Sequence, residues 1–123
     1  MLNIIKMLVI SSEKSEYENI RNILKPLNAF ELNYANNIEY DFSDYDLIIA
    51  DLDSFNNYRE MEIFKKIKKS NNKASIIFIK SIKDSNSIKR IDRTTVLGKP
   101  VTESRLIESI YKIVIENVCE ILY

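Results

Sequence analysis

Short apolar runs that each end in polar residues recur along the chain, and they constrain its fold more than any other feature. Four runs show this pattern, and the polar residues that follow them are Ser11-Ser12-Glu13, Asp51, Lys80 and Gly98-Lys99-Pro100. Such runs indicate buried parallel strands that deliver polar side chains to one edge of a sheet. We therefore expect strands over residues 3–10, 46–50, 75–79 and around 96–97.

Segments with helical spacing of apolar residues separate these strands. Ser15 and Glu18 form a capping box, and apolar residues from Tyr17 onward predict a helix that ends near Lys25, because Pro26 follows. A second helix is expected around Met61, Phe64 and Ile67, together with Ile63, before the break at residues 70–72. Residues 84–95 give a weak helical pattern, and Thr102 is placed to cap a long final helix.

Two segments between these helices deviate from the simple alternation. Phe30, Leu32 and Tyr34 alternate with polar residues, which predicts a half-exposed edge strand. Residues 36–42 have room for a stub of helix only. The repeated alternation of strand and helix predicts a parallel, doubly wound α/β sheet with right-handed crossovers.

Composition limits the function. The chain has 123 residues, which suit a single domain over residues 1–123, and its 18 basic and 18 acidic residues balance. We therefore expect no nucleic-acid or membrane partner, and we interpret the lysines of residues 65–69 as a solvated helix face. The absence of histidine excludes histidine-based catalysis and histidine-ligated metal sites. The single cysteine, Cys119, and the lack of a long apolar span favour a soluble, cytoplasmic chain.

The strand ends, taken in order, resemble the receiver domains of two-component response regulators. Ser11-Ser12-Glu13, Asp51, Lys80 and Lys99-Pro100 carry this resemblance, which covers almost the whole chain. It implies a flavodoxin-like three-layer (βα)5 sandwich with strand order 2-1-3-4-5. In such sheets the carboxyl ends of the strands form the binding crevice, where Ser11, Ser12, Asp51, Lys80 and Lys99 would meet.

The resemblance also implies a phosphoryl-transfer chemistry, in which a strand-end aspartate accepts phosphate from a phosphohistidine. Asp51 matches the acceptor, Lys99 the phosphate-binding lysine, and Pro100 the proline that commonly follows in a cis peptide. The two metal-binding acids of the family fall on Ser11 and Ser12, or on Ser12 and Glu13 if the register shifts by one. Neither register restores two carboxylates, and the position of Asp53 ligates through its backbone in the family. We expect Mg²⁺ binding to be weak or absent, because hydroxyls bring no charge to offset a dication.

The position of the family's signalling hydroxyl, at the end of the fourth strand, falls on Lys80. We therefore expect Lys80 and Lys99 together to neutralise Asp51, with the ammonium of Lys80 in the region of the metal and phosphoryl group. An unpaired buried carboxylate is costly, so such pairing would hold the crevice in one charge state.

These patterns favour a pseudo-receiver, not an enzyme, that acts through protein contacts without phosphorylation. Its partner would be a histidine kinase, an effector or a second copy of the chain. The expected contact residues on the fifth strand and last helix are Val96, Arg105, Ile110, Tyr111 and Val118. Two alternatives remain, namely a receiver that is still phosphorylated on Asp51 with the help of Glu13 and Asp53, and a small flavodoxin-like ligand binder or enzyme. The absence of a glycine-rich phosphate loop weighs against the last.

Overall fold

The computed structural model describes residues 4–81 and 94–122, with side chains for residues 4–81 and 94–113. Five strands form one sheet in the order β2-β1-β3-β4-β5, and every neighbouring pair is parallel. The strands are β1 (Ile5–Ile10), β2 (Phe30–Ala35), β3 (Leu47–Asp51), β4 (Ser75–Lys80) and β5 (Thr94–Gly98). The helices are α1 (Lys14–Leu24), α2 (Glu60–Ser70) and α3 (Glu103–Leu122), with short 3-10 helices η1 (Lys25–Leu27) and η2 (Leu52–Ser54). The doubly wound sheet and the strand order expected from the sequence are confirmed.

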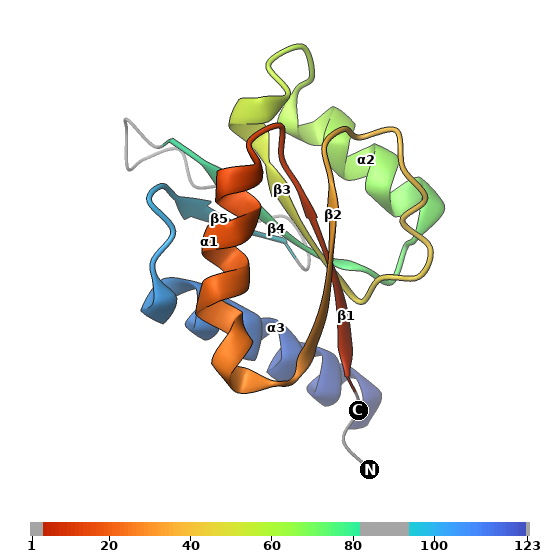
Figure 1. Ribbon diagram of the computed structural model, residues 1–123. Helices are drawn as coiled ribbons and strands as arrows, with labels where there is room; N and C mark the ends of the chain where they lie inside the picture. Colours follow the sequence, from red (N-terminus) through yellow and green to blue (C-terminus); the bar gives the residue numbers. More distant parts are fainter. Residues whose placement is uncertain (1–3, 82–93, 123) are drawn as a thin grey trace.

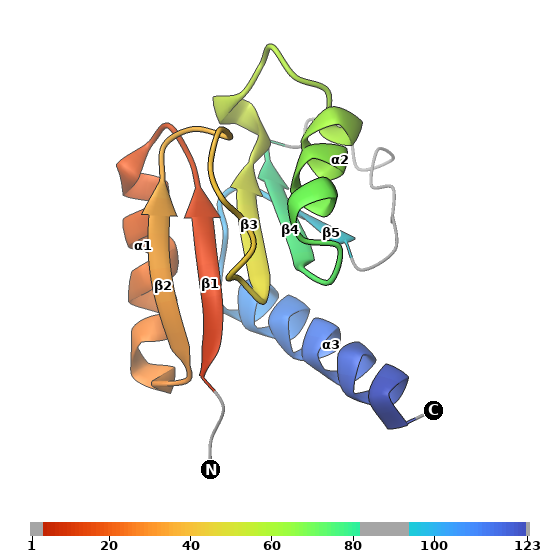
Figure 2. The same ribbon diagram turned by 90° about the vertical axis from the view of Figure 1, so that its right-hand side faces the viewer.

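Helices cover both faces of the sheet, with α1 and α3 on one side and α2 on the other (Figures 1 and 2). On the first face, Ile20 and Leu24 of α1 and Leu106 and Ile110 of α3 pack on alternate residues of the strands. On the second face, Ile63 and Ile67 of α2 pack on the other set of residues. The central strands are therefore buried on both sides, which explains their continuous apolar runs.

A loop takes the place of a further helix between β2 and β3. Its residues Ile38, Phe42 and Tyr45 are buried and complete the core on the α2 side of the sheet. The side-chain amide of Asn71, just after α2, donates to the carbonyl oxygens of Phe42 and Tyr45, both at 2.8 Å. The Asn71 side chain thus supplies hydrogen-bond donors to two backbone carbonyls that, in a loop, have no helical or sheet partner.

Several local expectations are confirmed and others are wrong. Pro26 ends α1, which passes into η1, and Phe30–Ala35 is an edge strand. Ser15 does not cap α1, because the helix begins at Lys14 and its N-cap residue is Glu13. Met61 faces solvent, with 44% of its surface exposed, so of the expected helix face Ile63 and Ile67 are buried and Met61 is not. The expected helix at residues 84–95 falls mostly outside the described residues.

Candidate functional site

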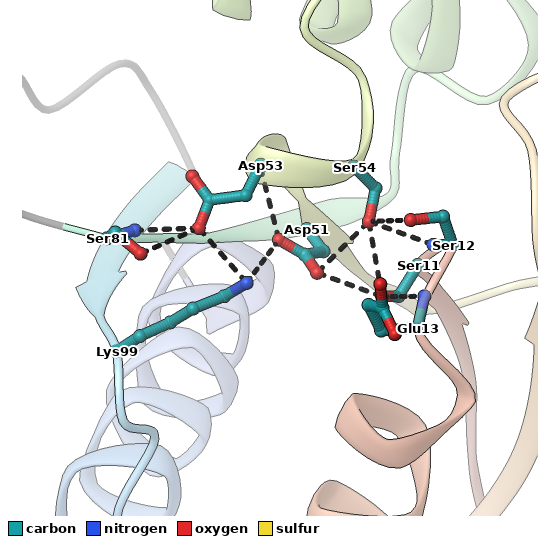
Figure 3. Close-up of polar contacts among 8 residues, drawn as sticks. All are labelled: Ser11, Ser12, Glu13, Asp51, Asp53, Ser54, Ser81 and Lys99. Atoms are coloured by element: carbon teal, nitrogen blue, oxygen red, sulfur yellow. Dashed lines mark hydrogen bonds and ion pairs between the residues drawn. The ribbon is translucent and has the colours of Figure 1, made fainter.

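The end of β3 places Asp51 at the carboxyl edge of the sheet, between the ends of β1 and β4. Ile10 pairs with Ala50, so Ser11 and Asp51 leave neighbouring strands side by side. Asp51 is only 1% exposed, although it is a charged residue. Figure 3 shows it between Lys99 on one side and Ser11 and Ser54 on the other. A carboxylate at this depth is stable only if its oxygens have partners.

Four donors surround the Asp51 carboxylate. Oδ1 accepts from the Lys99 ammonium at 2.8 Å and from the Asp53 backbone N–H at 3.1 Å. Oδ2 accepts from the hydroxyl of Ser11 at 2.9 Å and from the hydroxyl of Ser54 at 3.1 Å. Each oxygen therefore receives two hydrogen bonds, and the buried charge is fully compensated by protein groups.

The serine hydroxyls form a chain that is directed at Asp51. Ser54 Oγ accepts from the backbone N–H of Ser12 at 2.8 Å and from the Ser12 hydroxyl at 3.0 Å. Ser11 Oγ accepts from the backbone N–H of Glu13 at 3.0 Å. Each hydroxyl has one proton to donate, and with their lone pairs engaged in this way Ser11 and Ser54 direct those protons at the carboxylate.

Lys99 bridges two acids. Its Nζ lies 3.1 Å from Asp53 Oδ2 as well as 2.8 Å from Asp51 Oδ1. Burial lowers the pKa of Lys99, but its hydrogen bonds to Asp51 and Asp53 and their charges outweigh this effect and raise the pKa. Burial raises the pKa of Asp53, but hydrogen bonds from Lys99 and Ser81 outweigh it and lower the pKa. Lys99 is therefore charged and engaged on both sides.

Asp53 connects this ion pair to the residue that follows β4. Its Oδ2 accepts from the backbone N–H of Ser81 at 3.0 Å and from the Ser81 hydroxyl at 2.9 Å. Ser81, one residue after Lys80, therefore brings a hydroxyl to the crevice close to where the resemblance led us to expect one. A shift of one residue along a strand exchanges its two faces, which is why sequence spacing alone misplaced it.

The expected ion pair between Lys80 and Asp51 is wrong. Asp51 pairs with Ile79 across β3 and β4, so the side chain of Lys80 leaves the sheet on the opposite face. Among residues 4–81 and 94–113, the ion pair to Asp51 comes from Lys99. One ammonium group, that of Lys99, therefore balances the charge of Asp51, and the hydroxyls of Ser11 and Ser54 donate hydrogen bonds to it.

Glu16 is a further acid near the crevice that the sequence did not indicate. It lies in the first turn of α1 and is half-buried. Burial raises the pKa of Glu16, the charge of Lys99 lowers it, and the charges of Asp51 and Asp53 raise it further, with a net upward shift. Glu16 therefore interacts electrostatically with the lysine and the two aspartates of the crevice.

The remaining residues expected at the site have different positions in the structure. The Lys99–Pro100 peptide is cis. Glu13 contributes its backbone N–H to Ser11. Of the expected contact residues, Val96 and Ile110 are buried in the core, so only Arg105 and Tyr111 reach the surface, and the side chain of Val118 lies outside the described part.

Comparison with known proteins identifies the fold. No protein-family model matches the sequence, and no curated protein matches it. Among solved structures, the chain is similar to a response regulator receiver domain protein from Clostridium thermocellum, at 22% identity and a TM-score of 0.74, over 98% of this chain and 100% of that one. A two-component response regulator from Clostridium difficile is 20% identical with a TM-score of 0.70, over 89% of this chain and 95% of that one. A response regulator receiver protein from Sinorhizobium medicae WSM419 is 14% identical with a TM-score of 0.71, over 92% and 96%. The chain has the receiver fold, as expected.

The described helices also bear on the membrane question. None of them is both long enough and apolar enough to cross a bilayer.

Proposed function

We propose that the chain is a pseudo-receiver, a signalling domain of bacterial two-component systems that acts through protein contacts without phosphorylation. The observation that carries this proposal is the saturation of Asp51 by four protein donors. Its fold, shared with receiver domains, supports a role in signalling, and its partner would be a histidine kinase or an effector protein. We propose no catalytic activity and a cytoplasmic location.

The groups around Asp51 do not fit a magnesium ion. Mg²⁺ requires oxygen ligands that offer lone pairs in near-octahedral geometry, and it usually takes carboxylates. Ser11 and Ser54 instead point protons at Asp51 Oδ2, and the described part of the chain contains no group of three or more histidine, cysteine or acidic side chains placed to hold a metal ion. A dication at this position would meet hydroxyl protons and the ammonium of Lys99.

The same contacts oppose phosphorylation of Asp51. Attack on a phosphoryl group needs a free carboxylate oxygen and cations that offset the dispersed charge of the transferred group. Both oxygens of Asp51 already receive two hydrogen bonds, and Lys99 is shared with Asp53. Asp51 and Lys99 would therefore have to lose some of their present hydrogen bonds before Asp51 could attack a phosphoryl group and Lys99 could bind it.

Acetyl phosphate with Mg²⁺ tests the proposal. After incubation, intact-mass measurement should show no added phosphate on the wild-type chain. The Ser11→Asp, Ser12→Asp double variant, which restores both acids, is the matched comparison and should bind Mn²⁺ in a calorimetric titration. A phosphate adduct on the wild type that is lost in Asp51→Asn would overturn the proposal and establish the alternative, a receiver still phosphorylated on Asp51.

A further inference from the structure

The edge strand β2 presents unpaired backbone groups. Within the sheet it pairs with β1 alone, and Figure 2 shows it as the outermost strand on its side. Ile5 N–H bonds the carbonyl of Ala29, and Ser11 N–H bonds that of Ala35. Because residues of a parallel strand bond to one neighbour alternately, the odd-numbered residues face β1. The N–H and C=O groups of Phe30, Leu32 and Tyr34 therefore point outward.

The side chains of Phe30 and Leu32 border a groove beside α1. A hollow of about 250 Å³ lies between α1 and β2, and Leu24, Phe30 and Leu32 form its apolar floor. The ring of Tyr17 lies against that of Tyr34, with centroids 5.0 Å apart. Both figures of the whole chain show α1 running along β2. A strand added to β2 would thus place alternate side chains in this groove.

Two cations flank the groove. Arg21 and Lys25, one turn apart at the end of α1, also line it, and both are exposed. Neither side chain forms an ion pair or hydrogen bond with another residue of the described part of the chain. Exposed strand edges are commonly protected by charge, proline or a covering element, yet here the charges flank an open groove.

We propose that β2 and this groove bind an extended acidic segment of a partner protein, which adds to the sheet as a sixth strand. Its backbone would pair with Phe30, Leu32 and Tyr34, an apolar side chain would fill the groove, and its carboxylates would meet Arg21 and Lys25. A second copy of the chain fits less well. Two-fold pairing of β2 with itself would put both α1 helices on one face and join two basic surfaces, with no acidic group to meet Arg21 and Lys25. The proposal goes beyond the proposed function, since this surface is separate from the Asp51 crevice.

A short peptide tests the proposal directly. The probe is Thr-Glu-Thr-Leu-Thr-Glu-Thr, whose glutamates and leucine share one face of a strand. Titration of the full chain by NMR, with peptide up to on the order of 1 mM, should slow hydrogen exchange at the amides of Leu32 and Tyr34. The amides of Glu31 and Asn33, which face β1, should change little.

Matched variants and peptides separate charge from backbone pairing. Arg21→Gln with Lys25→Gln should weaken binding at least about fivefold and remove most of its salt dependence, whereas Lys65→Gln on α2 should leave it unchanged. The same peptide N-methylated at its three central residues should not bind, because it cannot pair with a strand.

Three results would overturn the proposal. The first is equal binding of a peptide with lysine in place of glutamate, and the second is the absence of new protection at Leu32 and Tyr34. The third is a dimer in solution, by light scattering, whose association protects the same amides, because the occupant of β2 would then be a second copy. None of these results depends on phosphate or metal, so they leave the proposed function of the crevice untouched.

Discussion

The crevice at Asp51 and the edge at β2 treat polar groups in opposite ways. In the crevice, each carboxylate oxygen of Asp51 has two donors, and Lys99 has two acids. At the edge, the outward backbone groups of three residues and the cations Arg21 and Lys25 have no protein partner in the described part. The polar groups of the Asp51 crevice are thus occupied by internal bonds, whereas free backbone groups and cations lie at the β2 edge of the sheet.

The largest effect is expected from Asp51→Ala. It leaves the hydroxyls of Ser11 and Ser54 without their acceptor and Lys99 with Asp53 alone, so the free energy of unfolding should fall by about 3 kcal/mol. Urea unfolding followed by circular dichroism measures this change, with Asp44→Ala, at an exposed loop residue, as the control. Unchanged or higher stability would mean that Asp51 is repelled by its surroundings, as in a cluster of acids.

Ser11→Ala tests one bond of the same set. It removes a hydroxyl that donates to the buried Asp51 carboxylate at 2.9 Å, and a hydrogen bond to a charged group justifies a loss of about 1–2 kcal/mol. The same urea experiment applies. Ser15→Ala in α1, where the serine is exposed, should change stability by less than about 0.5 kcal/mol. Equal effects in both variants would contradict the role given to Ser11.

Asp53 should make a smaller contribution that depends on pH. Hydrogen bonds from Lys99 and Ser81 lower its pKa despite burial, so the folded state favours the charged form. This contribution is present above the unfolded pKa, about 3.9, and is lost as pH falls through the lower folded value. Unfolding free energies of the wild type and Asp53→Asn should therefore differ at pH 7 and converge in acid. A difference that is constant from neutral to acidic pH would contradict this account.

The smallest effect on stability is expected at the edge. Arg21→Gln with Lys25→Gln should shift the free energy of unfolding by no more than about 0.5 kcal/mol, because both side chains are exposed and unpaired. Urea unfolding of this double variant beside Asp51→Ala measures the contrast between the two regions. A loss as large as that of Asp51→Ala would show that the edge, too, is internally bonded.

The sequence predicted the sheet because its apolar runs are long, buried on both faces and separated by clear helical stripes. Asp51, Lys99 and Ser11 were predicted to meet because parallel strands end at one edge, and the structure brings them together. The two-fold alternation of a strand also explains the error at Lys80, since it is the next residue, Ser81, that reaches the crevice, where it bonds Asp53. An assignment along a strand that is off by a single residue therefore places the side chain on the wrong face of the sheet.

Other features could not be predicted from spacing at all. Ser54 lies in a turn, and its hydroxyl reaches Asp51 only because η2 folds the chain back over the strand end. Glu16 comes close to the crevice through the placement of α1, which is a tertiary effect. The start of α1 differed because the hydroxyl of Ser11 already bonds the backbone of Glu13, and this leaves the capping box at Ser15 without a role.

Asn71 has a consequence for how the domain assembles. The loop between β2 and β3 has no repeating hydrogen bonds of its own, and a residue from beyond α2 holds its carbonyls at Phe42 and Tyr45. These hydrogen bonds connect Asn71 to residues that lie 29 positions (Phe42) and 26 positions (Tyr45) earlier in the sequence. We therefore expect the loop and the end of α2 to unfold together, because each fixes the position of the other.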